Sequence, residues 1–498
     1  MRALRSCVWS IVVSCCAAFP ASAQEDFNHP ELEWKTIETE HFYVHYHDGA
    51  ERTARVVAKV AEDVYEPVTS LYDHKPTQKV SFVIKDYDDI SNGAAYFFDN
   101  KVEIYAPSMD FEFRGTHNWL RNVVTHEFTH IVQIQTSMKF GRRLPAIYLQ
   151  WLGYEAERRP DVLYGYPNVI ASYPLSGFVV PVWFAEGIAQ YNRNDLRYDF
   201  WDSHRDMILR SYALDGKLLT WNQMGVFGKT SLGNESSYNA GFAFVSYIAH
   251  RYGEDKLAEI SRNLSTLTEV TIDGAIGRAV GKSGGEVYDD WRKEITEEYA
   301  SRTAEVRANL REGRMMSFNP HPEDAGVGEF RGGEGMIRGG ARQLPAGAHM
   351  EPCCRFDDFT GFANLYPTFS PDGKKLAYVS AKQGDYFALS SLYVKDLASN
   401  VETLVCPLVR TAPAWSPDGK KLYYAKSTRD NPHWSLQYDI YEYDLAAEKE
   451  QRITHGKRAL TPSVSPDGRS IAYVITADGT SNLAVAAIDG SGEKVITP

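Results

Sequence analysis

A ten-residue pattern that recurs three times constrains the fold of the C-terminal part of this chain. Residues 369–378, 415–424 and 464–473 each contain Ser-Pro-Asp-Gly, a basic residue and then apolar residues, at spacings of 46 and 49. Pro-Asp-Gly between apolar runs is typical of a tight turn, because Pro fixes one dihedral angle and Gly supplies a positive φ. The period is that of a four-stranded propeller blade.

The three copies resemble the repeats of TolB-type propellers, and the resemblance covers residues 359–498. It implies an all-β domain whose turn residues are structural, so we assign no catalytic role to Asp372, Asp418 or Asp467. Closed propellers have about four to eight blades, and three copies are present. We therefore expect an incomplete propeller whose further blades follow in a longer natural protein. Closure by oligomerisation and an open fragment are the alternatives.

The N-terminal part carries a different pattern, His-Glu-Phe-Thr-His at residues 126–130. Apolar residues recur around it with a helical period over residues 118–132, and Thr116 or Asn118 can cap the start of this helix. Imidazoles four residues apart share a helix face and can reach the same ion. Zinc suits such ligands, and it keeps one position open for water when it is catalytic. Glu127 is then the candidate general base.

A third ligand has to come from another segment, and Glu186 is our candidate. It lies in residues 182–191, an apolar and helix-forming segment in which an unpaired carboxylate would be costly to bury. The alternative is an acid that faces solvent near a helix start, where acids are common. Glu155 and Glu157 lie closer to the histidines, but their charged surroundings favour a solvated face.

Residues 126–130 and the later Trp-Phe-Ala-Glu-Gly-Ile-Ala segment at 183–189 together resemble the gluzincins of the peptidase MA-like clan. The resemblance implies an α+β zincin-like metallopeptidase domain. In such a domain His126, His130 and Glu186 bind Zn²⁺, and Glu127 activates the zinc-bound water. The 55 residues between His130 and Glu186 exceed the gap of more distant relatives, which suggests an inserted hairpin or lid.

The inserted segment, residues 141–181, is rich in Tyr, Pro, Leu and Val. An exposed segment of this composition is compatible with a hydrophobic lid or a contact with a membrane surface. Packing on the catalytic domain is an equally favoured alternative.

Alternating residues at 39–46, 79–84 and 101–105 predict strands, the last two on either side of Asn92-Gly93. An amphipathic helix is predicted at 50–72. The gluzincin resemblance implies that these strands and the helix form a small sheet whose edge strand pairs with an extended substrate. Residues 101–105 are our candidate for that edge strand. Residues 257–280 and 285–310 predict a helical subdomain that closes the cleft.

A further helix is predicted at residues 236–252, ending at Gly253. Similar clan members carry a Tyr at the start of this helix, aimed at the metal. By that resemblance Tyr238 is our candidate for stabilising the oxyanion. A core tyrosine is the alternative.

The first 23 residues have the features of a signal peptide: Arg2 and Arg5, an apolar stretch at 7–19 and Ala21-Ser22-Ala23 before the cleavage point. We therefore expect export to the periplasm or outer membrane, or secretion. No later apolar stretch is long enough for a transmembrane helix. The formal charge of −12 argues against nucleic-acid binding, which needs a basic patch.

Three cysteines lie beyond the predicted leader. An oxidising compartment allows one disulfide between Cys406 and either Cys353 or Cys354, with one thiol left over. Metal binding by these residues is the less favoured alternative, since their spacing matches no familiar zinc knuckle.

The sequence thus predicts a multidomain protein with a signal peptide at 1–23, a metallopeptidase domain at 24–312, a Gly-rich linker at 313–358 and propeller blades at 359–498. We expect a zinc-dependent peptidase acting on peptide or protein substrates, with a propeller that restricts access or binds an envelope protein. Endopeptidase action is favoured, because the Gly-Ala-Met-Glu-Asn strand of the aminopeptidases is absent and residues 92–96 contain no amine-binding acid. A non-catalytic envelope scaffold with a structural or vestigial zinc domain is the alternative.

Overall fold

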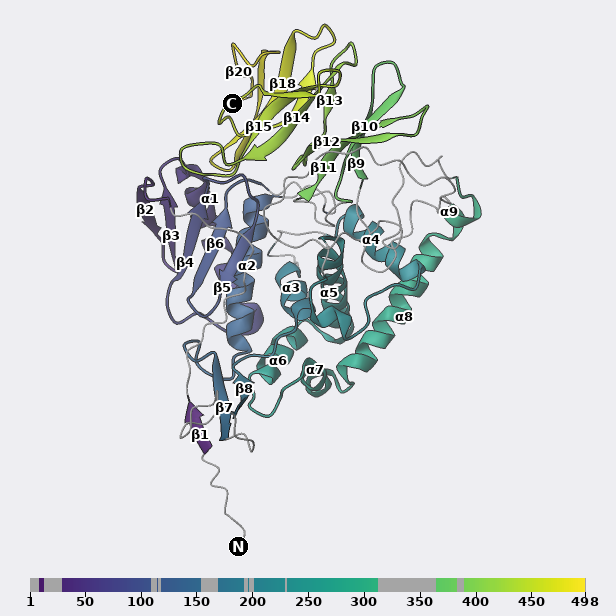
Figure 1. Cartoon of the computed structure of the whole chain (residues 1–498). Coiled ribbons are helices and arrows are strands. Elements are labelled where there is room, and N and C mark those ends of the chain that lie inside the picture. The colour runs from purple at the N-terminus through teal and green to yellow at the C-terminus, as the bar shows by residue number, and fades with distance from the viewer. Residues whose placement is uncertain are drawn as a thin grey trace, which may run out of the picture.

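The computed structural model describes residues 9–12, 29–108, 114, 118–153, 169–191, 196, 201–228, 231–311, 364–382 and 389–497 (Figure 1). Within them a strand-rich C-terminal region lies above an N-terminal region that combines one sheet with many helices (Figure 1). The predicted linker at 313–358 and almost all of the predicted signal peptide lie outside the described residues.

The N-terminal sheet has five strands in the order β2-β3-β4-β6-β5. Its strands are β2 (Trp34–Glu38), β3 (Phe42–His47), β4 (Val80–Lys85), β5 (Gly93–Tyr96) and β6 (Lys101–Tyr105). Strands β3, β4 and β6 are parallel, and β2 and β5 run antiparallel to their neighbours. Alternate residues of β3 and β4 are buried, as expected for strands with one face on a core.

The edge strand differs from the prediction. Strand β6 is the predicted edge at 101–105, but it pairs with β4 on one side and β5 on the other. The edge is therefore β5, which the sequence analysis did not predict. Its four residues, Gly-Ala-Ala-Tyr, contain no β-branched side chain, and this explains why their sequence gives a weak strand signal.

Two long helices accompany the sheet. Helix α1 (Glu51–Tyr72) and helix α2 (Trp119–Thr136) pack against each other in the same hydrophobic core as the strands. Phe128 of α2 is fully buried, and its ring centroid lies 5.2 Å from that of Phe42 on β3 and 5.8 Å from that of Tyr65 on α1. The aromatic residue inside the His-Glu-Phe-Thr-His pattern thus anchors α2 to the sheet.

The remaining helices form the other side of the N-terminal region (Figure 1). They are α3 (Val182–Gln190), α4 (Ser203–Leu214), η1 (Gln223–Gly225), α5 (Ser231–Tyr252), α6 (Asp255–Leu264), α7 (Ile272–Val280), α8 (Gly284–Arg302) and α9 (Ala304–Ala308). All of them except α9, which has no buried residue, share one hydrophobic core with the sheet and its helices. Helices are therefore present in the predicted ranges 257–280 and 285–310.

Helices α3 and α5 approach closely because each has a glycine at the contact. A Cβ atom on Gly187 would collide with the backbone carbonyl of Gly241, and one on Gly241 would collide with the carbonyl of Trp183. Any larger residue would separate the two helices. The position of α3, and with it that of Glu186, therefore depends on these two glycines.

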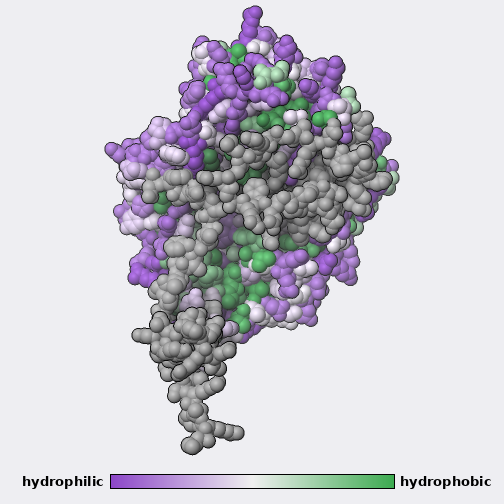
Figure 2. Space-filling model, viewed as in Figure 1, coloured by the Kyte–Doolittle hydropathy of each residue, from purple (hydrophilic) through white to green (hydrophobic). Residues whose placement is uncertain are grey.

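The predicted insert contains a hairpin. Strands β7 (Ala146–Gly153) and β8 (Val169–Ser176) pair antiparallel, and β1 (Trp9–Val12) pairs with the other edge of β7. Trp151, Tyr173 and Leu175 on this hairpin are exposed. On the face shown in Figure 2, hydrophilic residues predominate on the outer parts of the coloured surface, and hydrophobic ones gather below its middle. In the part of the chain that the structure describes, no helix is long and apolar enough to cross a membrane.

The C-terminal region consists of three four-stranded antiparallel sheets, one for each copy of the repeat. The first contains β9 (Asn364–Phe369), β10 (Lys375–Ser380), β11 (Ser391–Asp396) and β12 (Glu402–Pro407). The second contains β13 (Ala414–Trp415), β14 (Lys421–Thr428), β15 (Gln437–Asp444) and β16 (Lys449–Arg452). The third contains β17 (Ala459–Val464), β18 (Ser470–Ala477), β19 (Thr480–Ala487) and β20 (Lys494–Val495). Hydrophobic clusters lie between successive sheets.

The repeated turns have the predicted conformation. Gly373, Gly419 and Gly468 have φ values of 68°, 70° and 70°. Each turn aspartate accepts a hydrogen bond from the serine hydroxyl two residues earlier, at 2.6–2.7 Å. The aspartates thus stabilise their own turns, in agreement with a structural role.

Residues 86–89, which we call the docking loop, join the two regions. Arg458 donates hydrogen bonds to the carbonyl oxygen of Asp86 at 3.0 Å and to its carboxylate at 2.8 Å, and it also bonds Asp89. The Asp89 carboxylate accepts a hydrogen bond from the backbone N–H of Tyr438 at 2.8 Å. Because these groups are largely buried, the docking loop holds the second and third blades against the N-terminal region.

The proposed disulfide partners of Cys406, Cys353 and Cys354, lie outside the described residues. Cys406 itself is buried, and its thiol donates to a carboxylate oxygen of Glu450 at 3.2 Å. Burial raises the pKa of this thiol to about 12. Such a thiol is a poor nucleophile and a poor metal ligand, because both roles need the thiolate.

Candidate metal centre

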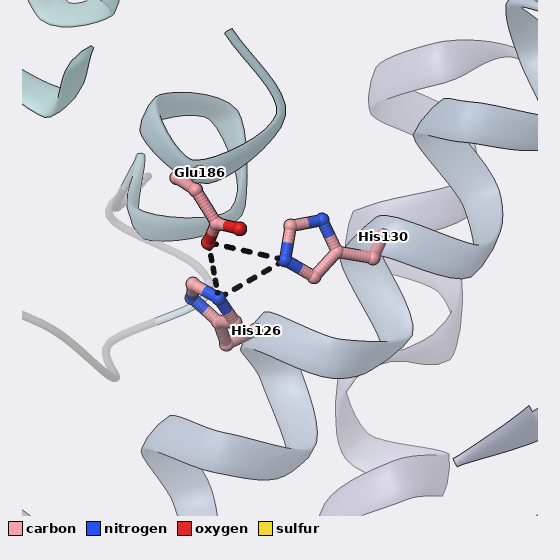
Figure 3. Close-up of side chains that lie close together, drawn as sticks. All are labelled: His126, His130 and Glu186. Carbon is pink, nitrogen blue, oxygen red and sulfur yellow. Dashed lines mark hydrogen bonds and ion pairs between the residues drawn. The ribbon is translucent and has the colours of Figure 1, made fainter. Parts of the chain in front are cut away.

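Three side chains from two helices converge at the candidate site (Figure 3). His126 and His130 lie one turn apart on α2, and their Nε2 atoms are 3.1 Å from each other. Glu186 on α3 places its Oε2 atom 3.1 Å from Nε2 of His126 and 3.3 Å from Nε2 of His130. The structure therefore brings together the three ligands predicted from sequence.

Local features of α2 fix the two histidines. Of the two predicted caps, Asn118 accepts a hydrogen bond from the backbone N–H of Arg121 at 3.2 Å, and Thr116 lies outside the described residues. Phe128 faces the sheet, so the imidazoles on either side of it face α3. Nδ1 of His130 is buried without a hydrogen-bond partner among the described residues, so packing rather than a hydrogen bond to Nδ1 orients this ring.

The spacing of the three donor atoms fits a tetrahedral zinc ion. Ligands about 2.0–2.1 Å from such an ion lie about 3.3 Å apart along the edges of the tetrahedron. The observed separations of 3.1, 3.1 and 3.3 Å are close to that value. Two imidazoles and one carboxylate are also a donor set typical of catalytic zinc. These three residues form the sole group with such spacing among the described His, Cys, Asp and Glu side chains.

Charge in the site is balanced between the same three groups. Burial alone would raise the pKa of Glu186, but the imidazoles of His130 and His126 outweigh this effect and hold that pKa far below its usual range. Burial would likewise lower the pKa of His130, yet the Glu186 carboxylate raises it. The carboxylate of Glu186 and the imidazole of His130 thus favour opposite charges.

Glu127 lies beside the edge strand. It is 7% exposed, and burial raises its pKa although His126 and His130 act in the opposite direction. It accepts a hydrogen bond from the backbone of Ala95 on β5. A Cβ atom on Gly93 would lie 2.7 Å from its Oε1 atom. A carboxylate with a raised pKa next to the predicted ligands is suited to accept and release a proton.

Tyr238 lies near the site but not at the start of its helix as predicted. Helix α5 begins at Ser231 instead of 236, so Tyr238 lies two turns inside it. Its ring centroid is 6.4 Å from that of His126. Burial, together with the Glu186 carboxylate, raises the pKa of the phenol well above its usual value. Tyr238 therefore stays protonated and able to donate a hydrogen bond.

Two residues near the site were not predicted from sequence. Arg114 precedes α2, and Glu235 lies one turn before Tyr238 on α5. They form an ion pair next to the phenol ring. In the sequence, the spacing of Glu235 and Tyr238 indicates a shared helix face. Arg114 lies in a segment without periodicity, so nothing in the sequence indicates that it pairs with Glu235. The competing candidates Glu155 and Glu157 lie outside the described residues.

Comparison with known proteins concerns the C-terminal region. Residues 360–498 match the family model of the TolB beta propeller domain, and the chain therefore carries a TolB-type propeller domain there. No curated protein matches the chain.

Among solved structures, a TolB protein from Agrobacterium tumefaciens is similar at 29% identity, covering 26% of this chain and 44% of its own, with a TM-score of 0.23. TolB from Acinetobacter baumannii matches at 22% identity over 27% of this chain and 44% of its own, with a TM-score of 0.18. The propeller domain of the trilobed protease from Pyrococcus furiosus matches at 19% identity over 27% of this chain and 43% of its own, with a TM-score of 0.22. The matched part of this chain thus spans less than half the length of these structures.

Proposed function

We propose that this chain is an exported zinc-dependent peptidase of the gluzincin type, joined to a TolB-type propeller. The observation that carries the proposal is the convergence of His126, His130 and Glu186 beside the buried Glu127. Zinc binding alone does not need Glu127, whereas hydrolysis needs a base next to the ligands. The four residues together therefore favour catalysis over a purely structural metal site.

His126, His130 and Glu186 would hold the ion through the three atoms that already face one another. When bound, zinc supplies a Lewis acid that lowers the pKa of water and polarises a carbonyl group. Glu127 takes the proton from the attacking water on its carboxylate and passes it to the leaving amine. Burial raises the pKa of Glu127 toward neutral pH. A carboxylate with such a pKa can both accept and release a proton.

Substrate would lie along β5. This strand forms one edge of the sheet, and in the described part of the chain no other strand pairs with its outer side. Extended peptides bind such edges through backbone hydrogen bonds. Since β5 also contacts Glu127 through Gly93 and Ala95, a peptide paired with β5 would run past the general base.

The second candidate function is a non-catalytic scaffold of the cell envelope, whose propeller binds a protein partner. The observation that favours it is the propeller domain itself, because the family match covers this domain. In that case the metal site would be structural or vestigial, and Glu127 would have no measurable role.

The two functions are distinguished by zinc content and peptide hydrolysis. We would purify the parent, Glu127→Gln and the control Glu66→Gln, which alters a carboxylate that pairs with Lys75 on the surface of α1. Peptidase function predicts one zinc in all three proteins, and cleavage of a mixed peptide library by the parent and the control only. Zinc without cleavage in any of them supports the scaffold. A parent without zinc contradicts the assignment of the site.

A further inference from the structure

Arg114 and Glu235 form a paired contact beside the candidate metal centre. Nε of Arg114 donates to Oε1 of Glu235 at 2.9 Å, and Nη2 donates to Oε2 at 3.1 Å. The two side chains are 12% and 4% exposed. A buried bidentate pair of this kind is geometrically specific, because the planar guanidinium fixes both partners.

The same guanidinium lies over the ring of Tyr238. Cζ of Arg114 is 5.0 Å from the ring centroid of Tyr238, within the range of a cation–π interaction. The ring of Phe227 stacks on Tyr238 with a centroid distance of 5.7 Å and an interplanar angle of 28°. Glu235 precedes Tyr238 by three residues, so both side chains leave α5 on the same face. The contacts with Arg114 and Phe227 thus fix the position of the phenol ring.

Arg114 also affects the charge around the Tyr238 phenol. The carboxylates of Glu186, Glu127 and Glu235 all act on the Tyr238 phenol, and Arg114 is the cation that opposes them. A cation held at this place offsets the negative charge around the phenol without forming part of the metal site. Since the Nε and Nη2 donors of Arg114 already bond Glu235, the guanidinium is better suited to orient the tyrosine than to bind a substrate carboxylate.

We propose that Arg114 and Glu235 are positioning residues, which hold the Tyr238 phenol beside the metal centre so that it can donate a hydrogen bond to the oxyanion formed during peptide hydrolysis. This inference rests on the proposed peptidase function. It adds to that function two residues outside the predicted ligand set.

The test is a double-mutant cycle. Tyr238→Phe should lower kcat by about 100-fold, the usual effect of removing one oxyanion donor. Arg114→Ala should lower kcat by about tenfold with little change in KM, and it should cause no further loss in the Tyr238→Phe background. Equal losses in both backgrounds would overturn the proposal, because Arg114 would then act independently of the tyrosine.

A folding defect has to be separated from a positioning effect. Arg114→Ala leaves Glu235 as an unpaired buried carboxylate, which is destabilising. The paired variant Arg114→Met with Glu235→Gln removes both charges and keeps side-chain volume. It should show the same loss of kcat with an unchanged zinc content. Retention of full activity by this paired variant would also overturn the proposal.

A second readout does not depend on activity. Oxidation of Tyr238 by hydroxyl radicals, which depends on the exposure of the ring and is measured by mass spectrometry, should increase several-fold in the paired variant relative to Tyr65, which lies in the core between α1 and the sheet. Unchanged oxidation would contradict a positioning role. If the parent hydrolyses no peptide, the proposed function fails, while oxidation still decides whether the pair holds the ring.

Discussion

The carboxylate of Asp478 caps helix α1, because its Oδ1 atom accepts a hydrogen bond of 2.8 Å from the backbone N–H of Thr53. Its Oδ2 atom accepts another from the N–H of Arg52 at 2.9 Å. Ala50, at the N-cap position of α1, has no side-chain acceptor. A hairpin of the propeller thus supplies a cap that the helix lacks in its own sequence, more than 400 residues away.

We expect Asp478→Ala to lower the stability of the N-terminal region by about 1 kcal/mol, the usual cost of losing an N-cap. Calorimetry would measure this as a lower midpoint of thermal unfolding. The control is Asp489→Ala, which removes a carboxylate bonded to Ser491 within its own turn. Equal destabilisation by the two variants would mean that the contact with α1 contributes nothing.

Removal of the metal should destabilise the parent protein. A ligand that binds only the folded state stabilises it by about 4 kcal/mol when present at a thousandfold excess over Kd. Treatment with a chelator should therefore lower the thermal midpoint, and added zinc should restore it. Glu186→Gln, which loses one ligand, should show a much smaller response. A parent protein whose midpoint is insensitive to chelator and zinc would contradict the assigned ligands.

Glu103 gives a prediction about pH. Its two carboxylate oxygens lie 2.9 Å from Nζ of Lys85 and 2.8 Å from Nζ of Lys101. Burial alone would raise the pKa of Glu103, but the hydrogen bonds from the two lysines outweigh it and lower that pKa. Since the folded pKa lies below the unfolded one, this residue contributes stability above the unfolded pKa and loses that contribution as pH falls through the folded pKa.

The parent should therefore be more stable than Glu103→Gln at neutral pH, and the difference should shrink as the pH falls below about 4. Thermal unfolding of both proteins over a series of pH values measures this. A difference that stays constant across the series would show that ionisation of Glu103 does not contribute.

Local patterns allowed prediction of the features that lie on single elements. The helix with His126 and His130 follows from apolar periodicity, and the blade turns follow from Pro and Gly. Glu186 meets these histidines only in the tertiary structure, and it was predicted through the resemblance of two motifs. Other features that depend on tertiary contact were missed. The edge role of Gly93–Tyr96 depends on which strand pairs with which, and the contacts of Arg114 and Asp478 join segments far apart in the chain. Such partners carry no periodic signal in one sequence.

Gly93 links the edge strand to the candidate general base. A Cβ atom at this position would lie 2.5 Å from Cγ2 of Val123 and 2.7 Å from Oε1 of Glu127. Real Cβ atoms do not approach other atoms so closely, so either β5 or the Glu127 side chain has to move. Overpacking of this kind typically costs about 1–3 kcal/mol.

Gly93→Ala should therefore lower kcat by about tenfold or more, since a displaced base or substrate-binding strand no longer has the geometry for proton transfer. Zinc content should stay at one per chain, because the atoms nearest to this position belong to Val123 and Glu127 and not to the three predicted ligands. Gly141→Ala is the matched control: a Cβ atom there meets nothing within 4 Å, and its φ is not positive. Full activity of Gly93→Ala would mean that β5 and Glu127 do not act together, and it would remove the structural argument for substrate binding along this edge.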